Sequence, residues 1–93
     1  MTTNKKQQKK PQSMSLGEFL RSHRLGEELS QVAFAEFLGI SKQRLCDIEH
    51  SRFVVSIKLA KDFARKLDLP PEWLAKLTIQ EQIEKERLNL KVS

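Results

Sequence analysis

The chain has 93 residues, a formal net charge of +5 at pH 7 and a pI near 9.6, which suits one small domain with polyanionic partners. Its single cysteine, Cys46, excludes an intrachain disulfide and a zinc site built on paired cysteines. No apolar run approaches the ~20 residues that span a membrane, and no apolar leader opens the chain, so we expect a cytoplasmic protein.

The positive charge is concentrated near the N-terminus, where Lys5, Lys6, Lys9 and Lys10 precede a body that is close to neutral. Residues 2–13 carry no apolar side chain, so this segment cannot bury enough surface to offset the entropy of ordering. We therefore predict a disordered basic arm over residues 1–14. The arm either contacts a polyanionic partner or is a non-specific solvated tail.

From Ser15 onward the apolar residues recur at helical spacing. Ser15 and Glu18 form a capping box that begins a first helix, with Gly26 at its end. We expect its inward face to hold Leu16, Phe19, Leu20 and Leu25. Ser30 caps a second helix, whose inward residues are Phe34, Ala35 and Leu38. Gly39 suits the left-handed residue that follows a helix end, where a Cβ is costly.

The second half of the chain continues the helical pattern. Ser41 caps a third helix that buries Leu45 and Ile48, and a loop follows over residues 50–55. Ser56 caps a fourth helix with an inward stripe of Ile57, Ala60, Phe63, Ala64 and Leu67. Pro71 opens a fifth helix, and a capping box over residues 78–81 predicts a separate, highly charged last helix to about Leu88. The fold class is therefore all-α.

Two short helices joined at Gly39 are typical of a helix-turn-helix, whose second helix enters the major groove of DNA. Because Leu45 and Ile48 point inward, Gln43, Asp47 and His50 point outward, with Arg44 and Cys46 beside them. Gln pairs with adenine, Lys or Arg with guanine, and Asp with cytosine. We predict the base-reading residues to be Lys42, Gln43, Arg44 and Asp47. The alternative is an ordinary solvated helix face.

Further polar residues are candidates for phosphate contacts. The free amides after Ser30 form an anion site at a helix N-terminus, where Ser30 and Gln31 would hold a phosphate. The alternative for Ser30 is a cap alone. We also assign phosphate contacts to Ser41, Arg52 and Lys58. The alternative is a solubilising charge for Arg52 and Lys58, and a cap alone for Ser41.

Taken together, these elements resemble the phage Cro and C1 repressor (XRE) family. The resemblance rests on Leu29-Ser30-Gln31, Ala35, Leu38-Gly39-Ile40-Ser41, Leu45, Ile48-Glu49, Ser56-Ile57, Ala64 and Leu67. It implies a compact five-helix, lambda-repressor-like domain over residues 15–77 that binds operator DNA as a symmetric dimer in a bacterial or phage setting. It also implies a structural salt bridge between Arg24 and Glu49.

Two positions depart from the family's usual pattern, with Ser51 in place of Gly and Val55 in place of Pro. Residues 53–55 therefore form an unusually apolar loop, which either packs against the helix that follows Ser56 or offers a contact surface. Residues 78–93 extend beyond the usual domain and are expected to make dimer or partner contacts.

We predict a dimeric transcriptional repressor that binds double-stranded DNA at an operator, for which its own promoter is one candidate. The alternatives are an antitoxin that neutralises a toxin through its C-terminal region, and a pure protein-interaction module. An enzyme is not expected. Cys46 and His50 share a helix face, but neither histidine has a metal-ligand spacing, and no catalytic or cofactor motif is present. We therefore predict no catalytic residue, metal or cofactor.

Overall fold

The computed structural model describes residues 14–92, and within this range the chain forms five helices and no strand. They are α2 (Leu16–Gly26), α3 (Gln31–Leu38), α4 (Lys42–Glu49), α5 (Ile57–Lys66) and α6 (Pro71–Val92). The all-α prediction is confirmed. The basic arm predicted over residues 1–14 lies, apart from Met14, outside the described residues.

A serine caps the N-terminus of each of the first four helices, as the sequence predicts. The hydroxyls of Ser15, Ser30, Ser41 and Ser56 each accept a hydrogen bond from the backbone N–H three residues on. Gly39 follows α3 with a φ of 81°, in the left-handed region that the turn requires. These local signals fix where α3 ends and where α4 begins.

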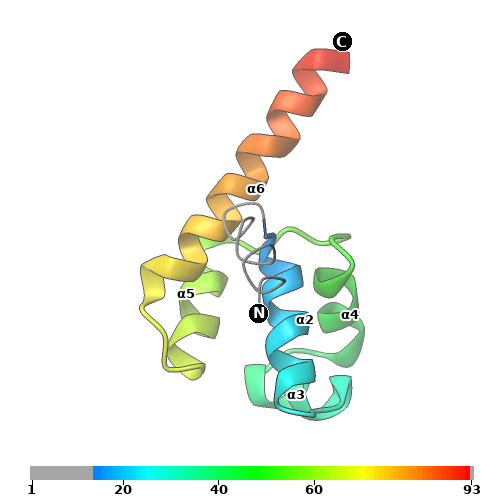
Figure 1. The fold of residues 1–93 in the computed structure, drawn as a ribbon, viewed down its shortest axis with the longest axis vertical. Helices are drawn as coiled ribbons and strands as arrows, with labels where there is room; N and C mark the ends of the chain where they lie inside the picture. The colour runs from blue at the N-terminus through cyan, green and yellow to red at the C-terminus, as the bar shows by residue number, and fades with distance from the viewer. Residues whose placement is uncertain (1–13, 93) are drawn as a thin grey trace, which may run out of the picture.

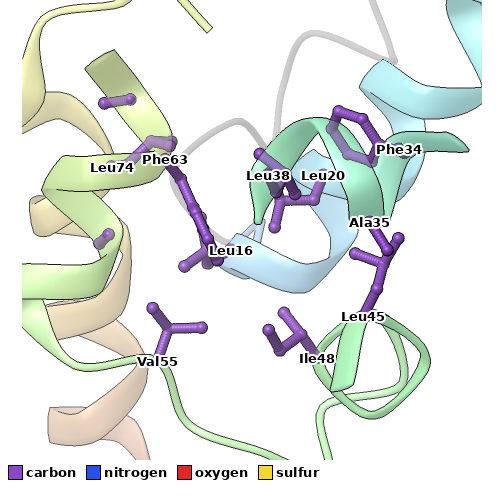
Figure 2. Packing of buried hydrophobic residues seen from close by; sticks show 12 residues of the cluster. Leu16, Leu20, Phe34, Ala35, Leu38, Leu45, Ile48, Val55, Phe63 and Leu74 are labelled. Carbon is purple, nitrogen blue, oxygen red and sulfur yellow. The ribbon is translucent and has the colours of Figure 1, made fainter. Parts of the chain in front are cut away.

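The α2 helix is central, with α4 on one side, α5 and the start of α6 on the other, and α3 across one end (Figure 1). Side chains from all five helices and from the loop before α5 converge on one core (Figure 2). The core comprises Leu16, Leu20, Phe34, Ala35, Leu38, Leu45, Ile48, Val55, Ala60, Phe63, Ala64 and Leu74. This core holds the helix-turn-helix pair α3–α4 against the rest of the domain.

Two residues expected in the core are exposed instead. Leu25 is 50% exposed because it lies nine residues after Leu16, which at about 100° per residue puts it on the opposite side of α2. Ile57 is 41% exposed because it opens α5 at the edge of the inward stripe that Ala60 and Phe63 define. Neither change alters the set of helices.

The prediction of a separate last helix starting at residue 78 is wrong. Residues 71–92 form one continuous helix, and Thr78 lies in its interior with no exposed surface. The hydroxyl of Thr78 donates a hydrogen bond to the carbonyl of Val55, so it ties α6 to the loop before α5 rather than capping a new helix. The second half of α6 extends away from the domain (Figure 1). No helix between residues 14 and 92 is both long and apolar enough to cross a bilayer.

The packing of α2 against α4 depends on Gly17, a residue to which the sequence alone gives no role. A Cβ at Gly17 would lie 2.0 Å from the backbone carbonyl oxygen of Ile48. Any side chain there would push α4 away from α2. The absence of a side chain at Gly17 thus allows the short distance between α2 and α4.

Candidate nucleic-acid interface

The α4 helix is fixed on its inner side and exposed on its outer side. Leu45, Ile48 and Glu49 are buried, whereas Lys42, Gln43 and Arg44 are exposed. The first turn of α4 therefore presents three polar side chains on a rigid support. This is the arrangement in which recognition helices contact base edges.

Two of the predicted base-reading residues are joined to each other and to Arg52. The amide nitrogen of Gln43 donates to Asp47 Oδ1 at 3.1 Å, and Arg52 forms an ion pair with the same oxygen at 3.2 Å. Arg52, predicted from the sequence to contact phosphate, thus lies beside Gln43 and Asp47, two of the residues predicted to read bases. The Arg52 side chain is 55% exposed, so the ion pair orders the Asp47 carboxylate more than it stabilises the fold.

Arg44 is positioned by an aromatic residue that we did not assign to the site from the sequence. The guanidinium carbon of Arg44 lies 3.8 Å from the centre of the Phe53 ring, a cation–π contact. Phe53 is half-buried against the core, and Val55 beyond it is buried. Phe53 and Val55 therefore pack on the core, which agrees with the packing interpretation of residues 53–55. The apolar character of this loop was the feature of the sequence that could have pointed to Phe53.

Behind the exposed face, Glu49 anchors the end of α4 to α2 and α3. Its carboxylate accepts from Arg24 Nε at 2.8 Å, from Arg24 Nη2 at 3.1 Å and from the amide nitrogen of Gln31 at 3.0 Å. Arg24 also donates to the carbonyl of Leu29 at 3.0 Å. The Glu49 side chain is only 1% exposed and that of Arg24 12%, so this is a buried ion pair.

Apart from Arg52, which lies in the loop after α4, the residues assigned to phosphate contacts lie at the N-termini of helices. The hydroxyls of Ser30 and Ser41 accept from Ala33 N and Arg44 N, and each keeps its own proton to donate to a phosphate. The side-chain amide of Gln31 donates one N–H to Glu49, so its second N–H is free to donate to another acceptor. Lys58 is exposed in the first turn of α5.

Cys46 and His50 lie close together on α4, but not in an arrangement that activates the thiol. His50 Nδ1 lies 2.9 Å from the carbonyl oxygen of Cys46 and 3.6 Å from its sulfur. Because a carbonyl oxygen only accepts, this contact puts the ring proton on Nδ1, which then cannot take a proton from the thiol. Among the described residues, no group of three or more His, Cys, Asp or Glu side chains is placed to hold a metal ion.

Residues 15–77, more than half of the chain, match the family model of a helix-turn-helix domain. Comparison with curated proteins and with solved structures gave no match. The matched range runs from the cap of α2 to Leu77 in the second turn of α6, and it includes every residue assigned above to base or phosphate contacts.

Proposed function

Since the chain belongs to the helix-turn-helix domain family, a DNA-binding family that typically has no enzymatic activity, we propose that it is a sequence-specific transcriptional regulator. The observation that carries this proposal is the exposed first turn of α4, which presents Lys42, Gln43 and Arg44 while its inner side is held by Glu49. The resemblance to Cro and C1 repressors agrees with the family match.

In the proposed complex the first turn of α4 enters the major groove. Gln43 pairs with an adenine, and Lys42 and Arg44 contact guanines. Asp47 accepts a hydrogen bond from the amino group of a cytosine. At a site without that cytosine, its negative charge would weaken binding. Phe53 holds the Arg44 guanidinium in a limited range of orientations, which lowers the entropy lost on binding.

Phosphate contacts on either side of the groove would set the position of α4. The N-termini of α3 and α4 carry free backbone amides, to which Ser30 and Ser41 add hydroxyl protons and Gln31 an amide N–H. Lys58 adds a positive charge at the start of α5, and Arg52 can reach a phosphate only by loosening its ion pair with Asp47. These contacts carry affinity and register rather than sequence information.

The regulator is proposed to act as a symmetric dimer that represses by occupying an operator, including the operator of its own promoter. Two copies would place two α4 helices on successive major grooves, so the operator would contain an inverted repeat. A dimer agrees with the small size of the domain, because one copy offers few residues for base contacts and two copies double their number.

A second candidate function is that of an antitoxin, favoured by the projecting half of α6. Ile79 and Ile83, in the middle of α6, are 39% and 53% exposed on one side of the helix, a surface on which a partner protein could fold, and Leu88 further along is 60% exposed. A toxin partner and DNA binding are compatible, because α4 and this part of α6 belong to different sides of the domain (Figure 1).

A gel-shift assay on the DNA upstream of the protein's own gene tests the proposal. Wild-type protein is expected to give a complex that survives excess non-specific competitor DNA, and the Lys42→Ala, Gln43→Ala double variant is expected to lose it. Lys85→Ala on α6 is the matched control, since it removes one exposed positive charge outside the proposed interface. Equal binding by both variants would reject α4 as the reading helix.

The same assay with the product of the adjacent gene separates the two candidate functions. A complex with that product, lost when residues 82–93 are deleted, would establish the antitoxin role. Deletion must spare Thr78, because its buried hydroxyl belongs to the core of the domain. If the protein binds specific DNA but forms no complex with the product of the adjacent gene, the antitoxin role is rejected and the repressor role is retained.

A further inference from the structure

The side chains of Gln43, Asp47 and Arg52 form one connected network along α4 and the loop after it. Gln43 Nε2 lies 3.1 Å from Asp47 Oδ1, and Arg52 Nε and Nη2 lie 3.3 and 3.2 Å from the same oxygen. One carboxylate oxygen therefore accepts from two side chains. The other oxygen, Oδ2, takes part in none of these contacts, so it stays available to a base.

The backbone also holds Arg52 next to Asp47. The backbone N–H of Arg52 donates to the carbonyl of Asp47 at 2.7 Å, and that of Ser51 donates to the carbonyl of Ile48 at 3.0 Å. With Ser51 at a φ of 60°, this is the left-handed turn that commonly ends a helix. Arg52 is attached to Asp47 through its main chain and its side chain, so holding this ion pair costs less side-chain entropy than holding an ordinary surface pair.

The chemistry of the carboxylate fixes the orientation of the Gln43 amide. Because a carboxylate only accepts hydrogen bonds, the group of Gln43 that faces Asp47 is its NH₂ group and not its carbonyl oxygen. One N–H is used in this bond, so the amide has one N–H and one carbonyl oxygen left for a base. In the major groove adenine presents an acceptor, N7, and a donor, the N6 amino group, and these match the two groups that Gln43 has left.

The same bond excludes a competing base. Guanine presents two acceptors in the major groove, N7 and O6, so a two-point contact with it requires two donors. A glutamine side chain without a partner has two N–H groups and can meet that requirement. Gln43 has only one N–H to offer while it is bound to Asp47. The network therefore favours adenine over guanine at the base that Gln43 contacts.

We propose that Asp47 is a positioning residue which, held by Arg52, orients the Gln43 amide so that it reads adenine and rejects guanine. This inference rests on the proposed function for the contact of Gln43 with a base, and it adds the groups that determine the specificity of that contact. In this role Arg52 stays on Asp47 when DNA binds, instead of moving to a phosphate.

Competition binding by fluorescence anisotropy tests the proposal, on operators that differ only at the base pair where Gln43→Ala relaxes the preference. Wild-type protein is expected to prefer adenine there, and Asp47→Ala is expected to lower the ratio of adenine to guanine affinity about fivefold or more. In the Gln43→Ala background, Asp47→Ala should have no further effect at this position, because it acts through Gln43. Glu86→Ala on α6 is the matched control, since it removes one exposed negative charge outside the network.

Arg52→Ala separates positioning from a phosphate contact. Positioning predicts a lower ratio of adenine to guanine affinity at the same position, with an unchanged salt dependence of binding. A phosphate contact predicts weaker binding to all sequences and a salt slope that is lower by about 1. The second result would overturn the proposal that Arg52 stays on Asp47.

The outcomes separate this proposal from the proposed function. If Gln43→Ala relaxes one position and Asp47→Ala leaves the ratio of adenine to guanine affinity there unchanged, the positioning role is rejected while base reading by α4 stands. Additive effects of the two substitutions at that position would also reject the positioning role. If Gln43→Ala relaxes no position, base reading by Gln43 is rejected, and the positioning role is rejected with it.

Discussion

Removal of the Glu49 carboxylate is expected to be among the most damaging changes to the domain. Glu49→Ala deletes the acceptor of three hydrogen bonds, two from Arg24 and one from Gln31. The Arg24 side chain, only 12% exposed, would then keep its charge without its partner. Water cannot readily replace the lost carboxylate at this depth.

The expected cost follows from the burial of the pair. Loss of one partner of a buried ion pair costs about 3–5 kcal/mol in the free energy of unfolding. Small domains have a total of about 5–15 kcal/mol, so the variant would lose a large share of its stability. For a domain of this size the melting temperature should fall by more than about 10 °C.

Thermal and urea unfolding followed by circular dichroism would measure this effect. Glu18→Ala is the control, because Glu18 also accepts a backbone hydrogen bond, from Ser15 N at 3.1 Å, but is exposed. It should cost about 1 kcal/mol, the net value of one such hydrogen bond. The Arg24→Met, Glu49→Leu double variant should be more stable than Glu49→Ala, since no unpaired charge remains. A Glu49→Ala cost equal to that of Glu18→Ala would refute the reasoning.

Three further changes test the support of α4. Phe53→Leu removes the ring beneath Arg44, so DNA affinity should fall by about 1 kcal/mol. The preference for the guanine proposed as the partner of Arg44 should also relax, as measured by fluorescence anisotropy on matched and substituted sites. Unchanged preference would exclude a positioning role for Phe53. Gly17→Ala puts a methyl group against the Ile48 carbonyl and should lower the free energy of unfolding by about 3 kcal/mol or more in urea titrations, whereas a near-neutral result would contradict the close helix contact. Ser51 has a φ of 60°, so Ser51→Gly should raise stability by about 1 kcal/mol in the same titrations, and a loss of stability would show that the hydroxyl matters more than the backbone.

The local features of the fold could be predicted from the sequence because each depends on one or a few neighbouring residues. Serine caps and the left-handed Gly39 act within a single turn, and both are confirmed. The helical period identified most of the core for the same reason. Ser51 shows the limit, since its positive φ explains why glycine is usual there in the family that the chain resembles.

Contacts between distant segments could not be predicted in this way. The sequence around Thr78 has the pattern of a capping box, yet a carbonyl from residue 55 takes its hydroxyl and α6 continues unbroken. Phe53 meets Arg44, and Gly17 meets Ile48, only after the helices have packed. The outward side chains of α4 were identified, whereas the partners that hold Arg44 and Asp47 required the structure.

The central claim is that the first turn of α4 reads bases, and selection of binding sites from random DNA tests it most directly. Wild-type protein should select an inverted repeat with a defined preference at each position. Gln43→Ala should select the same repeat with one position relaxed in each half-site, at a cost of about 1–3 kcal/mol on the wild-type site. Selection of an identical sequence by both proteins would contradict the claim that Gln43 contacts a base.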